Sequence, residues 1–418
     1  MAQSAVVLGG GVAGLTAAME LLSRGWRVTI LEVKQRLGGR VHTVHDGKIR
    51  IELGAEFVHG KDPALAELIR DARLATLGVS EQNRRFNNGR LEPVPLWEKI
   101  SEIIRKIDPK QPDRTFADFV RRVLTNPDDR ELALGFVQGF DAADPSKASA
   151  HALLRAEVAS ERSSGDEQIR LKQGYGALVD WMAANVRRQS GLIHTGAVAK
   201  VVKWKPGEAD VAFERGGQRE HLSADAALVT LPLGVLKAGT LQFQPSLPRK
   251  AEAIAQLLFG NVRRATFVFR DVWWGKHDFG FVHSFDAAFP TWWSDPRGPV
   301  LTAWAGGPKA DALKGKTVRE LTTLGLEILS KLFSERITAL KKRIVAVHTH
   351  NWAADPHFLG AYSYLPVRGL DLPKVLAESV DNTLFFAGEA TVSDAQMGTV
   401  FGAVESARRA SKEMADAS

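Results

Sequence analysis

The chain has 418 residues, of which 44% are hydrophobic and 25% charged, a balance typical of a soluble globular protein long enough for two domains. It contains no cysteine, which excludes disulfides, thiolate metal sites and cysteine nucleophiles and fits a reducing compartment. The net charge of +7 would suit a nucleic-acid partner, but the basic residues are scattered and no nucleic-acid-binding motif accompanies them, so we interpret them as a solvated surface.

The first predicted elements form a strand–turn–helix–strand unit. Apolar residues that recur at helical spacing predict one buried face for the helix. The unit consists, in order, of an apolar strand at 5–8, a glycine cluster at 9–14, the helix, Gly25 at the helix end, a strand at 28–31, and Glu32.

This order is typical of a dinucleotide cradle. Gly9 permits the tight turn, Gly11 lets a pyrophosphate approach the backbone, and Gly14 allows helix and strand to pack closely. The helix N-terminus offers free N–H groups to phosphate. Glu32 is placed to bind ribose hydroxyls, which argues against a 2′-phosphate and hence against NADP. The alternative is an ordinary strand–turn–helix without a ligand.

The later elements suggest a different middle part. We predict mainly helices over 97–190, strands over 197–235 and at 262–270, a helix at 317–333, a strand from Thr383, and a last helix over 399–414. Nucleotide-fold elements thus open and close the chain. The prediction is a discontinuous cofactor domain over 1–75, 191–236 and 375–418, interrupted by a substrate domain over 76–190 and 237–374.

Further motifs follow one another along the chain: RLGGRV at 36–41, ELGAEFVHG at 52–60, NWAADPHFLGAYSYLP at 351–366, LFFAGEAT at 384–391 and GTVFGAVESARRA at 398–410. With the glycine cluster, they make the chain resemble the flavin-dependent amine oxidase superfamily, which includes polyamine oxidases, monoamine oxidases and lysine-specific histone demethylases. The matches run from residue 5 to residue 410. The pattern W-x-x-D-P-x-x-x-G-A-Y-S and the pair His59-Gly60 are most similar to the polyamine oxidase and histone demethylase branch.

The resemblance implies an α/β fold, with a Rossmann-like FAD-binding domain, discontinuous in sequence, and an α+β substrate-binding domain that includes a helical insertion. FAD would be held non-covalently, since the lack of cysteine excludes a cysteinyl-flavin bond, and no metal is implied. The residues that the resemblance assigns to FAD are Gly9, Gly11, Gly14, Glu32, Gly38, Gly39, Arg40, Leu53, Gly54, Ala55, Glu56, Val198, Trp352, Gly388, Glu389, Gly398, Thr399 and Val400.

One part of this assignment has a physical reason, and other parts have an alternative explanation. Gly398 to Val400 would bring the last helix's N-terminus to the flavin pyrimidine ring, where the helix dipole stabilises the negative charge of reduced flavin. Taken singly, Trp352, Tyr362 and the LFFAGEA segment also fit plain core packing. Taken together and in order, they favour the flavin site.

The implied reaction is oxidation of a polyamine or related amine by hydride transfer to flavin N5. The imine would hydrolyse to an aldehyde and an amine, and O2 would reoxidise the flavin to give hydrogen peroxide. The candidate catalytic residues are Arg264, Tyr362, His59 and Thr399. Tyr362 matches an aromatic wall of the substrate site, and Thr399 stands at the opposite wall, as in histone demethylases. His59 matches a histidine that contacts substrate in animal polyamine oxidases, with a structural hydrogen bond as the alternative.

Arg264 departs from the family pattern. Relatives usually carry a lysine there that holds a water against flavin N5, and arginine differs because it keeps its charge and donates in a fixed fork. Arg264 either holds this water or points to solvent. The chain is therefore predicted to be an oxidase or, alternatively, a dehydrogenase that passes electrons to another acceptor.

Other functions stay open at this point. They are a flavin desaturase of the same fold, and a flavoprotein without turnover. The expected partners are a small-molecule amine and O2, with no nucleic acid and no membrane; the absence of a leader or a membrane-spanning run favours the cytoplasm. Acidic residues for a polycationic substrate cannot be placed, although the substrate part contains Asp286, Asp295, Glu161 and Glu167. The sequence has no signal for the oligomeric state.

Overall fold

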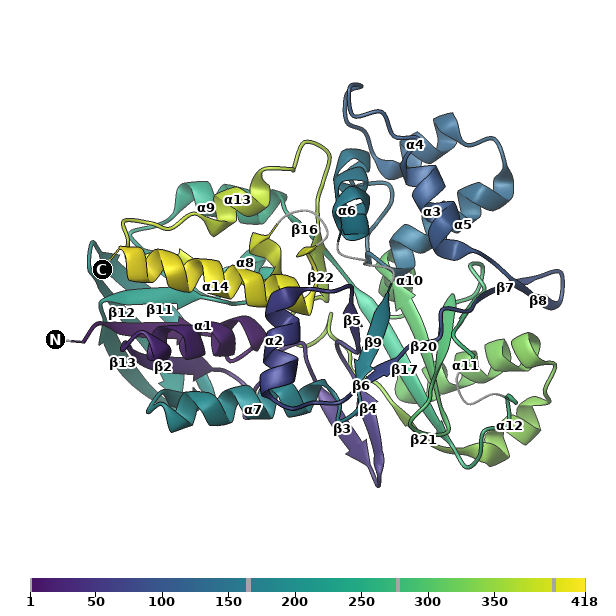
Figure 1. Ribbon diagram of the computed structural model, residues 1–418, viewed down its shortest axis with the longest axis horizontal. Coiled ribbons are helices and arrows are strands. Elements are labelled where there is room, and N and C mark those ends of the chain that lie inside the picture. The colour runs from purple at the N-terminus through teal and green to yellow at the C-terminus, as the bar shows by residue number, and fades with distance from the viewer. Residues whose placement is uncertain (1, 163–166, 276–278, 393–395, 418) are drawn as a thin grey trace.

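The computed structural model describes residues 2–162, 167–275, 279–392 and 396–417. One end of the molecule holds both termini and a layered sheet, and the other holds a second sheet with a group of short helices beside it (Figure 1). Segments from the beginning, the middle and the end of the chain share the first sheet, so the α/β architecture is discontinuous in sequence, as predicted.

The first sheet is parallel and has the strand order β10–β2–β1–β14–β23. Layers cover both of its faces, and the two strands at its centre, β1 and β14, are accordingly apolar in every residue except Ser4. The strands are β10 (Leu192–Thr195), β2 (Arg27–Glu32), β1 (Ser4–Leu8), β14 (Ala226–Val229) and β23 (Leu384–Phe386).

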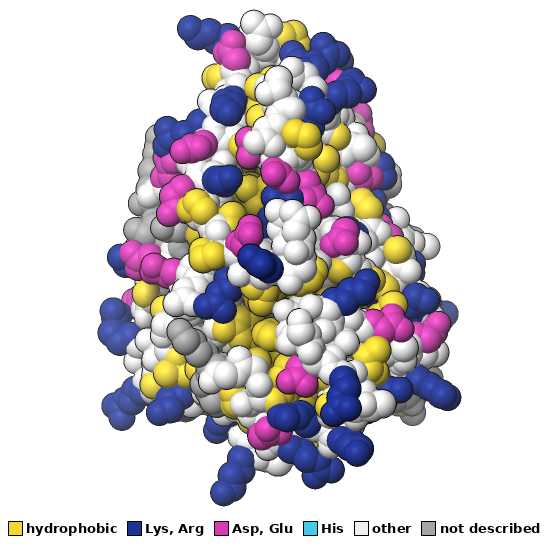
Figure 2. Space-filling view, turned by 90° about the vertical axis from the view of Figure 1, so that its right-hand side faces the viewer, with side chains coloured by type: hydrophobic (Ala, Val, Ile, Leu, Met, Phe, Trp, Pro, Cys, Tyr) yellow, Lys and Arg dark blue, Asp and Glu magenta, His cyan; other side chains and the backbone are white. Residues whose placement is uncertain are grey.

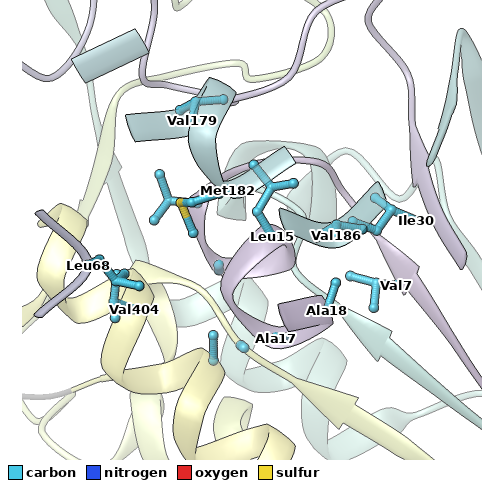
Figure 3. Close-up of a cluster of buried hydrophobic side chains, with 14 of the residues drawn as sticks. Val7, Leu15, Ala17, Ala18, Ile30, Leu68, Val179, Met182, Val186 and Val404 are labelled. Carbon is cyan, nitrogen blue, oxygen red and sulfur yellow. The ribbon is translucent and has the colours of Figure 1, made fainter. Parts of the chain in front are cut away.

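Helices cover one face of this sheet. They are α1 (Val12–Ser23), α2 (Pro63–Asp71), α7 (Tyr175–Arg188) and α14 (Val400–Asp416). Leu15 of α1, Met182 of α7 and Val404 of α14 meet in one apolar core with Val7 and Ile30 of the sheet (Figure 3). The apolar spacing seen in the sequence therefore marks the face of α1 that packs against its neighbours.

A second layer covers the other face. It contains β11 (Ala197–Lys205), β12 (Glu208–Arg215), β13 (Gln218–Ala224) and β15 (Gln242–Gln244). Val202 and Val211 of this layer share a core with Val6 and Leu8 of β1. Three short helices pack against the same core: α8 (Leu233–Lys237), α9 (Pro248–Gln256) and α13 (Leu372–Ala377).

The second large sheet has the order β21–β17–β20–β19–β18–β7–β8. Its strands are β21 (Ile344–His348), β17 (Val262–Phe269), β20 (Val300–Gly306), β19 (Thr291–Asp295), β18 (Phe281–His283), β7 (Asn83–Asn87) and β8 (Arg90–Pro93). Every residue of β17 is buried, including two arginines. Helices α10 (Gly307–Ala312), α11 (Val318–Phe333) and α12 (Ile337–Arg343) belong to this part.

Four helices form the predicted helical insertion and pack around an apolar cluster of their own. They are α3 (Leu96–Ile104), α4 (Phe116–Val123), α5 (Pro127–Gly139) and α6 (Ala150–Arg162). The remaining elements are small: β3 (Thr43–Asp46), β4 (Ile49–Glu52), β5 (Phe57–His59), β6 (Thr76–Gly78), β9 (Gln168–Leu171), β16 (Leu258–Gly260), β22 (Tyr362–Tyr364) and the 3₁₀ turn η1 (Glu389–Thr391).

The packing differs from the predicted domain boundaries at two places. Helix α7 lies on α1, and β15 extends the layer of β11, so both lie with the nucleotide-type sheet although the sequence placed them in the substrate part. Basic and acidic side chains are interspersed over the face shown in Figure 2, as the scattered charges predicted. Within the described residues, no helix combines the length and the apolar character needed to cross a membrane.

Candidate active site

A cavity of about 1180 Å³ runs from the carboxyl-end edge of the parallel sheet to helices α3, α5 and α6. Gly9, Val33, Thr230 and Gly388 line it, and each of them directly follows or nearly follows a strand of that sheet. The carboxyl edge is where open parallel sheets bind ligands. Every predicted site residue except Gly14 lines this cavity.

Gly14 has a different position. It lies inside α1, where an added Cβ would stand 1.9 Å from the Gly9 carbonyl oxygen. Its small size therefore serves the close packing of helix against turn, as the sequence predicted, and Gly14 is not among the residues that line the cavity.

Two glycine loops form a cradle at the start of α1. Gly9 has a φ of +112°, and the Gly38 N–H donates to the Gly10 carbonyl at 2.8 Å, which holds the loops together. Among the described residues, a Cβ added to Gly11 would have Gly39 Cα as its nearest neighbour, at 3.9 Å. The space above Gly11 is therefore open, as the close approach of a pyrophosphate requires.

Glu32 closes one side of the cradle at the end of β2. Its carboxylate accepts hydrogen bonds from the backbone N–H of Gly10 at 2.6 Å and of Lys34 at 2.8 Å. Burial raises the pKa of Glu32, and these two donors counteract part of that rise. Glu32 lines the cavity and each of its oxygens keeps a second lone pair, so the carboxylate is fixed in place and able to bind ribose hydroxyls.

Half-buried Arg40 and buried Glu389 form an ion pair at the cavity. Arg40 Nη1 donates to Glu389 Oε1 at 2.8 Å and to the Ala361 carbonyl, and Glu389 also accepts from the N–H groups of Ser363 and Gly398. Glu389 therefore joins the segments that contain Arg40, Ser363 and Gly398. The sequence predicted that Glu389 contacts phosphate, which a carboxylate alone would repel, whereas the structure shows that Glu389 binds Arg40 and two backbone N–H groups. Because Arg40 is bound to Glu389 and to a carbonyl, only part of its guanidinium stays available for an anion.

Helix α14 points its N-terminus at the same cavity. Thr399 is its N-cap: the hydroxyl accepts from the Gly402 N–H at 2.9 Å and donates to the Gln396 carbonyl at 2.6 Å. The hydroxyl is thus used by the cap, and Thr399 lies in the cavity wall, where the resemblance placed it. The free N–H groups and the dipole of this helix favour negative charge.

These residues fit FAD. The open cradle suits a pyrophosphate, Glu32 suits a ribose, Arg40 and the α14 N-terminus suit negative charge, and Val198 of β11 lines the same end of the cavity. Gly388 adds room, because its φ is +126° and an added Cβ would meet no described atom within 4 Å.

An aromatic wall continues from the cradle toward the helical insertion. Trp352 is buried, and its indole N–H donates to the Leu53 carbonyl at 2.9 Å. The Tyr362 hydroxyl donates to the Phe140 carbonyl at 2.8 Å, and burial, followed by the charges of Asp141 and Glu389, raises the pKa of this phenol. Tyr362 therefore stays neutral and acts as a wall.

His59 lies in the same wall, where its ring packs against Phe140 at 5.5 Å between centroids. Burial lowers its pKa to about 4, so the imidazole is neutral at physiological pH. The β5–β9 register places Gln168 opposite His59. His59 Nδ1 and Gln168 Oε1 are both buried and have no hydrogen-bond partner within the described part of the chain. The structural hydrogen bond that was the alternative role for His59 is thus not seen at Nδ1, and two neutral polar groups line the cavity.

Asp141 is a site residue that sequence reasoning missed. It follows α5, lines the cavity next to Tyr362, and has a buried Oδ2 without a partner among the described residues. Burial, followed by the charge of Glu157, raises its pKa to about 7. No motif covers this position. The only available signal was an acid directly after an aromatic helix end, in the stretch GFDAAD.

Other acidic side chains line the outer part of the cavity, namely Glu81, Glu98, Glu157 and Glu161. Glu161, which the sequence could not place, is exposed there and pairs with Arg105. The other three acids considered from the sequence lie elsewhere: Asp295 pairs with Arg297, Glu167 pairs with Lys61, and Asp286 accepts from Ser284. Over the residues that the structure describes, no group of three or more His, Cys, Asp or Glu side chains suits a metal ion.

Arg264 lines the cavity and does not point to solvent, since only 3% of the residue is exposed. Its guanidinium pairs with Glu56, which the sequence had assigned to FAD alone. Of the two predicted alternatives for Arg264, exposure to solvent is therefore wrong.

Comparison with known proteins decides the family. Residues 12–415 match the family model described as flavin containing amine oxidoreductase. The chain belongs to this family. It is thus an FAD-dependent enzyme of the flavin amine oxidases, as the resemblance predicted.

Relatives and solved structures agree with this assignment. The flavin amine oxidase described here is 29% identical to polyamine oxidase 4 of Oryza sativa subsp. japonica, with 98% of this chain and 88% of the relative covered. It is also 29% identical to lysine-specific histone demethylase 1 homolog 2 of Arabidopsis thaliana, with 98% and 58% covered. Its fold matches putrescine oxidase bound to putrescine with a TM-score of 0.83 at 18% identity, covering 100% and 99% of the two chains. Cyclohexylamine oxidase from Brevibacterium oxydans IH-35A matches with a TM-score of 0.82 at 19% identity, again covering 100% and 99%.

Proposed function

We propose that this enzyme oxidises a small-molecule amine where the FAD cradle meets the aromatic wall. When bound, FAD supplies at N5 the acceptor for a hydride from the carbon beside the amine nitrogen. The imine product hydrolyses to an aldehyde and an amine, and O2 takes up the electrons to give hydrogen peroxide. The observation that carries the proposal is the carboxylate of Asp141, whose buried Oδ2 has no partner among the described residues and which lines a cavity continuous with the cradle.

Asp141 is suited to receive the amine. An alkylammonium brings N–H donors and a positive charge, which satisfy an unpaired carboxylate oxygen. The amine must then lose a proton, because its lone pair assists hydride departure. A carboxylate whose pKa is about 7 takes that proton, so that an ammonium and a carboxylate become a neutral amine and a carboxylic acid. The aromatic surroundings favour this neutral pair over the ion pair.

The likeness to polyamine oxidases and the outer acids support a substrate with more than one nitrogen. Glu157 on α6 is close enough to Asp141 to raise its pKa, and Glu81 and Glu98 line the same cavity farther out. A diamine or polyamine would place one nitrogen at Asp141 and another among these carboxylates. We therefore expect kcat/KM to be higher for a diamine or polyamine than for a monoamine of similar size.

Tyr362→Phe tests the wall that supports Asp141. The substitution removes the hydroxyl that donates to the Phe140 carbonyl, one residue before Asp141. We expect the free energy of unfolding to fall by about 1 kcal/mol, the usual contribution of one hydrogen bond. KM for the amine should rise more than kcat falls, because Asp141 is displaced while the hydride acceptor is not. Chemical denaturation and steady-state kinetics measure both effects, and a fall in kcat at unchanged KM would contradict this role.

A dehydrogenase that passes electrons to an acceptor other than O2 is the second candidate. The observation that favours it is Arg264, whose guanidinium is bound to Glu56 and replaces the lysine that holds a water in relatives. Both candidates share the reaction with the amine and differ only in the molecule that reoxidises the flavin.

Anaerobic mixing of the holoenzyme with a panel of amines tests the proposal. The panel runs from spermine and N-acetylated polyamines to putrescine and aryl monoamines, and the flavin absorption band is followed in time. We expect rapid bleaching by at least one diamine or polyamine. Admitting air then separates the two candidates, because an oxidase recovers its colour quickly and a dehydrogenase does so slowly. If no amine bleaches the band, the desaturase and the non-catalytic alternatives take precedence.

A further inference from the structure

A buried ionic cluster lies between the segment after β4 and the second large sheet. The carboxylate of Glu56 is its centre: Oε2 accepts from Arg264 Nη2 at 2.5 Å, and Oε1 accepts from Arg170 Nε at 2.8 Å. The indole N–H of Trp293 lies 3.2 Å from both oxygens. At most 3% of each of the three charged side chains is exposed. The cluster is therefore shielded from solvent and from salt.

Arg264 is held in one orientation within this cluster. Besides Glu56, its guanidinium donates to the Thr266 hydroxyl at 3.2 Å and to the Gly54 carbonyl at 3.3 Å, and it lies 5.4 Å from the centre of the Trp293 ring. A lysine has one nitrogen and could not make these contacts together. Because an arginine does not deprotonate in proteins, the charge at this wall of the cavity is permanent.

The charges of the cluster do not cancel. Burial alone would raise the pKa of Glu56, but the charges of Arg264 and Arg170 outweigh it and lower the pKa to about 2, so the carboxylate is ionised at every relevant pH. Two guanidinium groups thus share one carboxylate. The neighbouring Arg297 has its own partner in Asp295. Within the group of Glu56, Arg170 and Arg264, the positive charge exceeds the negative charge by one. The carboxyl of Glu52 lies near Glu56 and Arg297, and burial raises its pKa, which favours its neutral form.

We propose that Glu56 is a positioning residue, which holds the guanidinium of Arg264 against Gly54 so that a permanent positive charge faces the flavin. The inference rests on the proposed binding of FAD along Leu53 to Ala55. A fixed cation beside the flavin favours the anionic forms of that ring. It also means that Arg264 serves the cofactor through its charge and its position, whereas Asp141 receives the amine.

Sulfite binding to the oxidised holoenzyme tests this proposal without turnover, because the adduct of sulfite with flavin N5 is anionic and bleaches the flavin band. Glu56→Asp keeps the charge and withdraws the carboxylate by one methylene. If Glu56 acts by position, sulfite affinity falls about tenfold. If Glu56 were only a counter-charge, the affinity would not change, and that result would overturn the proposal. Arg297→Lys, a change in the neighbouring ion pair outside the cavity, is the matched control and should leave sulfite affinity unchanged.

A second set of variants keeps the proposal testable if Glu56→Asp does not fold. Glu56→Gln removes a negative charge. If only the net charge near the flavin mattered, this substitution would strengthen sulfite binding. We expect it to weaken binding in the natural chain, where Arg264 loses its anchor, and to strengthen binding in an Arg264→Met background. Strengthening in both backgrounds would show that Glu56 does not act through Arg264. Failure of the proposed function is seen separately, as absence of flavin bleaching by amines in the unaltered enzyme.

Discussion

Asp141→Asn is expected to lower kcat/KM for the preferred amine by about 100-fold or more, the range in which a general base contributes. Asparagine has nearly the same shape and can still accept a hydrogen bond at its amide oxygen. It cannot attract the ammonium as an anion or take its proton. Anaerobic bleaching rates at several amine concentrations would separate loss of binding from loss of the proton acceptor, and both are expected to suffer.

The pH dependence gives this prediction a second readout. Because the pKa of Asp141 is about 7, kcat/KM of the unaltered enzyme should rise with pH through neutrality as the carboxylate forms. This rise should be absent in Asp141→Asn measured with the same amine. Asp144→Asn in the same loop is the matched control, since Asp144 pairs with Lys147 and is not among the residues that line the cavity. A variant at position 141 with an unchanged rate and profile would remove Asp141 from the mechanism.

Stability should change in the opposite direction to activity. The folded-state pKa of about 7 exceeds the ordinary value of 3.8, so the folded protein favours the protonated acid. The contribution of Asp141 to the free energy of unfolding is fully present at acid pH and is lost as the pH rises through about 7. The free energy of unfolding of Asp141→Asn should therefore exceed that of the unaltered enzyme by about 1–3 kcal/mol at pH 8 and be nearly equal to it at pH 4. Urea unfolding at the two pH values measures this difference.

Gly11→Ala is expected to lower FAD affinity about tenfold or more while the apoprotein still folds. Gly11 has a φ of −77°, which alanine adopts, and the nearest atom to its added Cβ among the described residues is 3.9 Å away. The methyl group would therefore occupy the space left for the pyrophosphate and displace little protein. A steric conflict of about 1–3 kcal/mol corresponds to about one or two powers of ten in the dissociation constant. Titration of apoprotein with FAD, followed by flavin fluorescence, measures it.

Gly14→Ala should behave differently because its added Cβ meets the Gly9 carbonyl oxygen at 1.9 Å. Helix α1 would have to move away from the turn, at a cost of about 2–3 kcal/mol that exceeds the gain of about 1 kcal/mol in helix propensity. The free energy of unfolding of the apoprotein should therefore fall for Gly14→Ala. For Gly11→Ala it should stay within about 1 kcal/mol of the value for the unaltered chain. Gly315→Ala, where no described atom lies within 4 Å of the added Cβ, is the control for both. Equal loss of stability at positions 11 and 14 would contradict the separate roles.

The cradle and its order along the chain were predictable from the sequence because the chemistry lies in consecutive residues. A turn that only glycine allows, a helix with one apolar face and an acid at the end of the next strand occur within residues 9–32. The positions of Trp352, Tyr362 and Gly388 followed from motifs whose internal spacing is short. All of these line one cavity in the structure, and only Gly14 does not.

Other properties were decided by tertiary structure alone. Asp141 has a raised pKa because the fold buries it beside Glu157, and no local pattern records that burial. Glu56, Arg170 and Arg264 are far apart in the sequence and meet only because β5, β9 and β17 converge. Local sequence therefore determined where the cofactor is held, since backbone shape depends on neighbouring residues. Burial and charge pairing depend on residues from distant segments, so only the fold decided the raised pKa of Asp141 and the ion pairing of Arg264, on which the two proposals rest.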